Sequence, residues 1–172
     1  MTARYQGPTL LASHHTVEDF TCRSVEQTDW LRRFAHQSNS TGTTKVFVVC
    51  EPGKERVIAY YAWCMAQIAI VEAPVRARRG AGRYPQPIAL LARLGVDVTH
   101  EGNGLGAGLL RDVILRLLGI EASIGCRGLV IHCESPAARA FYLDLIPELD
   151  ASPTDDLHLV LLMKDARKTA AR

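Results

Sequence analysis

The stretch VDVTHEGNGLGAGLLRDVILRLL, residues 96–118, decides the fold. Four glycines fall within seven residues, from Gly102 to Gly108, and an apolar helical pattern follows at once. Glycine lets the backbone turn several N–H groups toward one point without side chains in the way. The first turn of the helix adds unpaired N–H groups and the positive end of the helix dipole. The stretch therefore predicts a cradle for an anion such as a phosphate or pyrophosphate.

Two common phosphate-binding motifs fit this stretch poorly. A nucleotide-triphosphate loop needs Lys-Ser or Lys-Thr after its glycines, and neither pair follows here. A dinucleotide fingerprint requires an opening βαβ unit, whereas several predicted elements precede this loop. A tight glycine turn that binds no ligand remains open as an alternative.

The elements on either side of the loop predict an α/β fold. Leu105, Leu109, Val113 and Leu117 recur every four residues and form one apolar helix face, which suits packing on a sheet. Hydrophobic patterns and turn residues predict the remaining elements, including a second helix whose N-cap is Ser135 and whose first residue is Pro136. The predicted helices are 26–37, 105–118 and 135–146, and the predicted strands are 45–51, 56–70, 88–98, 127–133 and 157–164. This order is typical of a mixed sheet with helices packed on it.

Bulk composition indicates an ordinary globular chain. The 172 residues are 48% hydrophobic and 22% charged, with a net charge of +2. No apolar run approaches the roughly 20 residues that span a bilayer, and the N-terminus lacks a signal core, so we expect a cytoplasmic protein. Five scattered cysteines without a CxxC pair indicate free thiols in a reducing compartment, and neither these nor the histidines have metal-ligand spacing. His132 and Cys133 are adjacent in a predicted strand and point to opposite faces, which excludes a catalytic pair.

Positive charge gathers in two places. One is the run of Arg76, Arg78, Arg79 and Arg83 without an acidic residue among them, and the other is residues 164–172. A solvated loop is the ordinary interpretation of such a run. The forked guanidinium group of arginine also fits the oxygens of a phosphate, and the aromatic Tyr84 adjoins the cluster.

The loop with its strand and helix resembles the GCN5-related N-acetyltransferase (GNAT) family, whose motif is Gln/Arg-x-x-Gly-x-Gly/Ala. The motif falls on residues 101–106, and Glu101 departs from it at the Gln/Arg position. A carboxylate near a pyrophosphate is unfavourable unless it points away. The resemblance implies acetyl-CoA as co-substrate and no metal. It also implies a single domain over residues 1–164, a basic tail at 165–172, and a mixed central sheet that splays between its two central parallel strands.

The family resemblance also assigns roles to residues. Backbone amides of the loop would hold the pyrophosphate, the end of the preceding strand would polarise the thioester, and the start of the 135–146 helix would border the coenzyme. These coenzyme positions are Leu94, Gly95, Val96, Asn103, Gly104, Leu105, Gly106, Ala107, Gly108, Ser135 and Arg139. Tyr142 takes the place of the family's catalytic tyrosine, and a phenol that is neutral at pH 7 suits a proton donor to a thiolate. A core tyrosine with its hydroxyl at the surface is the alternative.

From about Leu10 to Lys164 the chain is similar to one subgroup, the acetyltransferase toxins of bacterial toxin–antitoxin pairs, although the usual Gly-Phe pair after FY is missing. This similarity implies acetylation of the α-amine of aminoacyl-tRNA, a ribbon-helix-helix antitoxin and a homodimer. The predicted RNA contacts are Arg78, Arg79, Arg83 and Arg93. Two alternatives stay open, an acetyltransferase of a small or protein amine and a catalytically degenerate CoA-binding regulatory domain.

Overall fold

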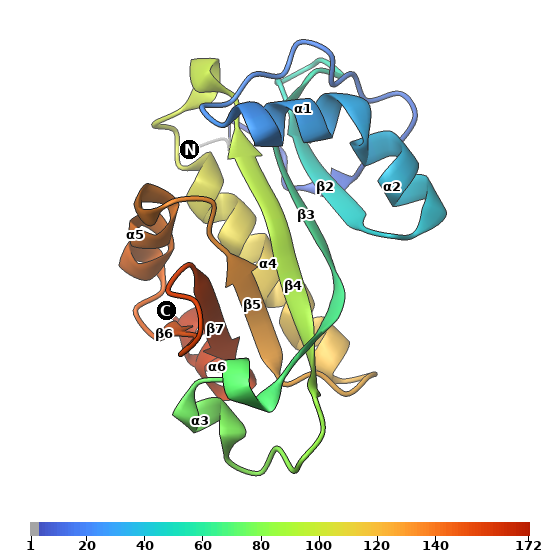
Figure 1. Cartoon of the computed structure of the whole chain (residues 1–172). Coiled ribbons are helices and arrows are strands. Elements are labelled where there is room, and N and C mark those ends of the chain that lie inside the picture. Colours follow the sequence, from blue (N-terminus) through green and yellow to red (C-terminus); the bar gives the residue numbers. More distant parts are fainter. Residues whose placement is uncertain (1–3) are drawn as a thin grey trace. The chain divides into compact units, whose positions relative to one another are not determined.

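The computed structural model describes residues 4–172 and divides into two compact units. The first unit holds the described residues up to Cys64 together with Ala92–Asp112, and the second holds Met65–Leu91 and Val113–Arg172. The strand order is β1-β2-β3-β4-β5-β7-β6 in a seven-stranded sheet, with elements labelled in Figure 1. Residues 1–3 of the predicted domain lie outside the described residues, and the single-domain assignment stays a prediction.

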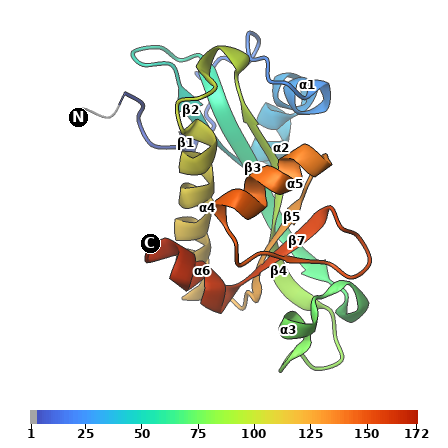
Figure 2. The same ribbon diagram turned by 90° about the vertical axis from the view of Figure 1, so that its left-hand side faces the viewer.

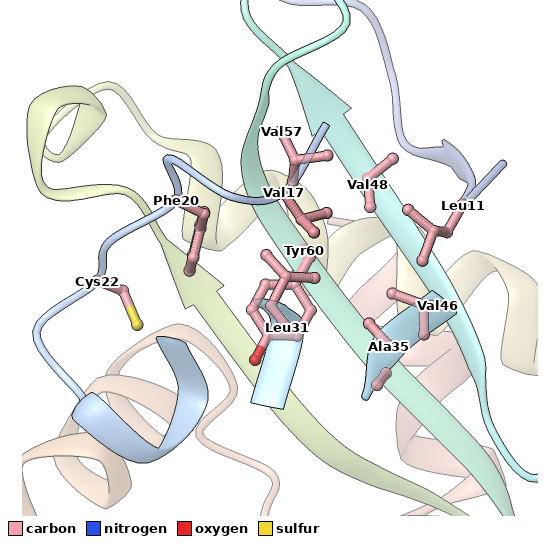
Figure 3. Close-up of a cluster of buried hydrophobic side chains, with 11 residues drawn as sticks. Leu11, Val17, Phe20, Cys22, Leu31, Ala35, Val46, Val48, Val57 and Tyr60 are labelled. Carbon is pink, nitrogen blue, oxygen red and sulfur yellow. The ribbon is translucent and has the colours of Figure 1, made fainter. Parts of the chain in front are cut away.

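The first unit is built on antiparallel strands. β1 (Thr9–Leu10) pairs with β2 (Lys45–Cys50), and β2 pairs with β3 (Val57–Ile68). The sequence runs 45–51 and 56–70, separated by a short turn, predict an antiparallel hairpin, and the pairing of β2 with β3 confirms it. Figure 3 shows the buried side chains that these strands share with residues 11–22 and with the helices α1 (Val25–Arg33) and α2 (Ala35–Thr41). They are Leu11, Val17, Phe20, Cys22, Leu31, Ala35, Val46, Val48, Val57, Tyr60 and Ala62.

The helix predicted over residues 26–37 is two helices in the structure. α1 (Val25–Arg33) ends at Phe34, whose φ of −120° leaves the helical region, and α2 (Ala35–Thr41) begins at the next residue. α2 continues through most of residues 38–43, for which the sequence predicts a loop. It ends at Gly42, which has a φ of 79°. A glycine in the left-handed region is a common helix C-cap, and this one sets the true end.

The second unit combines parallel and antiparallel pairing. β4 (Gln86–Val96) is parallel to β5 (Gly128–His132) from Ala89 to Leu91, and β7 (His158–Leu162) is antiparallel to β5. Two further helices belong to this unit, α3 (Val75–Arg78) and α5 (Pro136–Leu145). Its apolar cluster consists of Ile68, Ala73, Ala77, Ile88, Val130, Val160 and Leu162.

The C-terminal end differs from the prediction. The strand predicted over 157–164 stops at Leu162, and α6 (Met163–Ala170) follows it directly, as Figure 2 shows. Residues 165–170 of the predicted basic tail are therefore helical, and Asp165 and Ala166 are buried. β6 (Asp150–Ala151), which no sequence pattern indicated, pairs with β7.

Two short 3-10 helices and one long helix complete the chain. They are η1 (Ile70–Glu72), η2 (Val98–His100) and α4 (Leu105–Glu121). The apolar face predicted for α4 is confirmed, because Leu105, Leu109, Val113 and Leu117 are all buried. No helix within residues 4–172 is long and apolar enough to cross a membrane.

Candidate functional site

The glycine loop follows η2 and ends where α4 begins. Gly102 and Gly104 have φ angles of 74° and 78°, in the left-handed region that favours glycine. A Cβ added at either residue would meet nothing within 4 Å, so conformation rather than space requires glycine. The Gly108 amide donates to the Gly104 carbonyl (3.0 Å) and starts the helical pattern, which leaves the amides before it free of helix bonds. The predicted positions Asn103, Gly104, Leu105, Gly106, Ala107 and Gly108 thus form a helix start with the geometry of an anion cradle.

Asp97 holds the chain between β4 and the loop. Its side chain is 1% exposed and accepts hydrogen bonds from the Thr21 amide (3.0 Å), the Thr99 hydroxyl (2.6 Å) and Arg56 Nη2 (3.1 Å). Burial opposes ionisation, but the hydrogen bonds from Thr99 and Thr21 and the charge of Arg56 lower the pKa of Asp97. The carboxylate is therefore charged at neutral pH and fixes the approach to the loop.

Glu101, the departure from the family motif, is paired with Arg23. Arg23 donates from Nε and Nη2 to the two carboxylate oxygens at 2.9 and 2.8 Å. The pKa of Arg23 is raised by this hydrogen bond and by the charge of Glu101. The negative charge beside the cradle is thus balanced by a guanidinium that precedes α1.

A second arginine reaches the same loop. Arg4 Nη1 donates to Asn103 Oδ1 at 3.3 Å, and Asn103 Nδ2 donates to the carbonyls of His100 (2.9 Å) and Glu101 (3.1 Å). Arg4 therefore adds positive charge around the predicted anion site, while Arg23 offsets the charge of Glu101. Sequence reasoning missed both, because they lie 99 and 78 residues from their partners and carry no local motif.

The end of β4 is tightly packed on one side. A Cβ at Gly95 would lie 3.1 Å from Tyr60 Cε1 and 3.3 Å from Phe20 Cζ, so only glycine fits without a shift of these rings. Leu94, Gly95 and Val96 share the first unit with the glycine loop. Arg93, a predicted RNA contact, pairs with Glu26 (3.1 Å) and lies 5.0 Å from the centre of the Trp30 ring.

Tyr142, the predicted acid, is in the second unit on α5 and is only 7% exposed. Burial, and then the neighbouring Cys133 and Glu134, raise the pKa of Tyr142 well above its ordinary value. The phenol is therefore fully protonated at neutral pH and remains a hydrogen-bond donor.

The orientation of α5 corrects the sequence expectation. The sequence pattern puts Phe141 and Leu145 together on the apolar face of this helix, yet they are 38% and 36% exposed. The predicted start is confirmed, because Ser135 Oγ accepts from the Ala138 amide (3.1 Å) and Pro136 is the first helical residue. Arg139 donates from Nε to the Asp156 carbonyl at 2.9 Å, so one edge of its guanidinium is already engaged.

Two titratable residues near α5, Cys133 and His132, have the properties of packing residues rather than of catalytic ones. Burial raises the pKa of the Cys133 thiol to about 11, which keeps it protonated and a poor nucleophile. His132 stacks on His158 with ring centres 3.9 Å apart, and burial followed by the His158 charge lowers the pKa of His132. Within residues 4–172 no three His, Cys, Asp or Glu side chains form a group that suits a metal ion.

The two basic patches differ in how far their charge is neutralised. Near the C-terminus, Arg167 pairs with Glu121, Lys168 with Asp165 and Arg172 with Glu148. In the other patch, Arg78 donates from Nε to the Ala73 carbonyl at 2.8 Å and from Nη2 to the Val71 carbonyl at 3.4 Å. The side chains of Arg79 and Arg83 are exposed and have no hydrogen bond or ion pair within the described chain.

Comparison with known proteins places the chain. No protein-family model matches it. A tRNA-acetylating toxin of Mycobacterium tuberculosis is 40% identical over 163 residues, which make up 95% of this chain and 95% of the relative. The chain belongs to the tRNA-acetylating toxins. A probable toxin TacT of Sinorhizobium fredii is 27% identical over 114 residues, 66% of this chain and 63% of the relative.

Solved structures confirm the fold of this toxin family member. A KacT mutant superposes with a TM-score of 0.85 at 18% identity over 95% of this chain and 99% of KacT. AtaT in complex with acetyl-methionyl-tRNAfMet gives a TM-score of 0.84 at 17% identity over 94% of this chain and 96% of AtaT. The predicted GNAT fold, a mixed sheet with flanking helices, is therefore correct. The splay between the central parallel strands stays a prediction.

Proposed function

We propose that this chain is an acetyl-CoA-dependent N-acetyltransferase toxin that acetylates the α-amino group of aminoacyl-tRNA and thereby blocks translation. The observation that carries the proposal is the 40% identity with a tRNA-acetylating toxin over 95% of both chains. Two structural neighbours add support, since AtaT has been solved with acetyl-methionyl-tRNAfMet and with acetyl-CoA. An acetylated α-amine has lost its nucleophilicity and cannot extend a peptide.

The residues present fit a diphosphate-bearing coenzyme. The loop from Asn103 to Gly108 would hold the diphosphate, since the amides before Gly108 are free of helix bonds and lie at the positive end of the helix dipole. Arg4 would add positive charge beside them, while Arg23 offsets the charge of Glu101. A backbone amide in Leu94–Val96 would polarise the thioester carbonyl, and Ser135 and Arg139 would border the coenzyme. Acetyl-CoA supplies the activated acetyl group.

Tyr142 would supply the proton that the reaction needs. The acceptor amine nitrogen forms a bond to the acetyl carbon while the bond from that carbon to sulfur breaks. Tyr142 donates its phenolic proton toward the departing sulfur, and the amine releases one proton, so charge balances over the cycle. Tyrosine-to-phenylalanine mutants of both KacT and AtaT are among the solved structures.

The acceptor would be bound through RNA phosphates, chiefly at Arg79 and Arg83. Arg78 and Arg93, the other predicted contacts, already have partners within the protein and would contribute less. AtaT has also been solved with the C-terminus of its antitoxin AtaR and in a DNA-bound AtaT–AtaR complex. By analogy, we include a ribbon-helix-helix antitoxin and a homodimer in the proposal for this chain.

A direct test is to incubate the protein with acetyl-CoA and charged total tRNA, and then to identify the released aminoacyl groups by mass spectrometry. The proposal expects a mass gain of one acetyl group on one or more amino acids. If the aminoacyl groups stay unmodified while a small amine such as a polyamine is acetylated, the alternative acetyltransferase is correct. Coenzyme binding without transfer to any amine would favour the degenerate regulatory domain.

The pair of Arg23 and Glu101 gives a prediction for coenzyme affinity. Arg23→Gln leaves a bare carboxylate beside the diphosphate, and we expect the Kd of acetyl-CoA to rise about fivefold at low salt. Glu101→Gln in the same chain removes that carboxylate and should recover most of the lost affinity. Calorimetric titration of the wild type, both single variants and the double variant measures this coupling. Equal Kd values for the wild type and Arg23→Gln would contradict the prediction.

A further inference from the structure

The loop that joins α3 to β4 is fixed by hydrogen bonds from inside the second unit. Figure 1 shows it running from α3 to the start of β4. Arg127 Nη2 donates to the carbonyls of Ala77 and Arg79, both at 3.0 Å. Gln86 Nε2 donates to the Tyr84 carbonyl at 2.7 Å and also to the Ala81 carbonyl. These bonds hold the loop backbone at both ends.

Two arginines of the basic run, Arg76 and Arg78, are also bound to groups of the second unit. Arg76 pairs with Asp150 at 2.9 Å and with the buried Asp165 at 2.6 Å. Arg78 donates to the carbonyls of Val71 and Ala73, as described above. Arg76 is thus held by two carboxylates and Arg78 by two backbone carbonyls, which separates them from their neighbours in the run.

Three side chains remain for a partner. Arg79 and Arg83 present unpaired guanidinium groups, and the Tyr84 ring is 81% exposed, with no ring or hydrogen-bond contact among the described residues. Gly80 and Gly82, between the two arginines, have φ angles of 74° and 71°, in the left-handed region that favours glycine. A loop whose backbone is held and whose outer side chains are an aromatic ring and two cations resembles a binding platform rather than a solvated turn.

We propose that Tyr84 stacks on an unpaired base at the aminoacyl end of the RNA, while Arg79 and Arg83 bind the neighbouring phosphates. The inference rests on the proposed function, which makes an RNA that carries its amino acid on a single-stranded 3′ end the substrate. Arginines alone would suit any polyanion, but an exposed aromatic ring together with phosphate-binding groups is the combination that binds single-stranded nucleic acid. Each base stacked on an aromatic ring contributes about 5- to 150-fold in affinity.

The test compares Tyr84 variants on an aminoacylated RNA minihelix with an unpaired 3′ end. Tyr84→Ala is expected to lower kcat/KM about tenfold, mainly through KM, because the stacking surface is lost. Tyr84→Phe keeps the ring and should stay within about twofold of the wild type. Val75→Ala is the matched control, since it truncates an exposed apolar side chain on the neighbouring helix α3. Its kcat/KM on the minihelix should equal that of the wild type.

A second substrate separates stacking from a general defect. An amino acid methyl ester carries the same amine without nucleotides, so the wild type and Tyr84→Ala should acetylate it at equal rates. An equal loss on both substrates, or an unchanged kcat/KM on the minihelix, would overturn the inference. So would loss of antitoxin binding with full minihelix activity, which would assign the platform to a protein partner. A wild type that acetylates no aminoacyl-tRNA at all would instead reject the proposed function itself.

Discussion

Tyr142→Phe is expected to lower kcat about 100-fold or more while acetyl-CoA binding stays unchanged. The substitution removes the only proton that this side chain can donate and keeps the ring that packs inside the second unit. Thiol release followed with a chromogenic disulfide measures kcat, and calorimetry measures coenzyme binding. Expression of the variant alone should also relieve the growth arrest that the wild-type toxin is expected to cause.

The pH profile tests the same assignment. Because burial raises the pKa of Tyr142, its active protonated form persists past the ordinary phenol pKa of about 10. Activity should therefore rise as the acceptor amine loses its proton near pH 8 and should not fall again below about pH 10. Leu145→Met, at another exposed position of α5, is the control variant, because the Phe141 ring contacts the Tyr142 ring. A Tyr142→Phe enzyme with wild-type kcat would show that Tyr142 is a packing residue.

Charge reversal at the free arginines is the second large effect. Arg79→Glu combined with Arg83→Glu should lower kcat/KM for aminoacyl-tRNA by about 100-fold at low salt and leave the Kd of acetyl-CoA within about twofold. Both side chains are exposed and unpaired, so folding is not expected to suffer. Filter binding and acetylation at several salt concentrations measure the effect.

The matched control carries the same change in net charge. Arg33→Glu with Lys164→Glu reverses two other exposed cations that have no ion pair within the described chain. A general electrostatic effect would lower kcat/KM for aminoacyl-tRNA equally in both double variants. The loss of a specific RNA contact at the loop would lower it only in the variant of Arg79 and Arg83. Equal losses, or wild-type acetylation by the Arg79 and Arg83 variant, would contradict the assignment of this loop to RNA.

Features that depend on residues close together in the chain could be predicted from the sequence. The glycine loop, the apolar face of α4 and the cap at Ser135 all depend on residues within a few positions of one another, and the structure reproduces them. The end of α2 was missed because the polar composition of residues 38–43 is typical of a loop. In the structure the helix continues through these polar residues until Gly42 ends it. The strand at the C-terminus was extended too far because Met163 and Lys164 continue the apolar alternation although the backbone turns helical.

Features that depend on distant partners were beyond the sequence pattern. The faces of α5 were misassigned because Phe141 is more apolar than Tyr142, yet Tyr142 is the ring that is buried. The basic run looked uniform, and only the positions of Asp150, Asp165 and the loop carbonyls show which arginines are already engaged. Charge alone cannot reveal that division.

The Arg23–Glu101 pair has a consequence for how relatives are recognised. If the cation beside the coenzyme loop comes from a segment 78 residues earlier, then positions 23 and 101 are expected to co-vary. Chains with Gln or Arg at position 101 have no need of a basic residue at position 23, whereas chains with Glu do. A search that insists on the usual first residue of the motif would discard members that have moved this charge to another part of the chain.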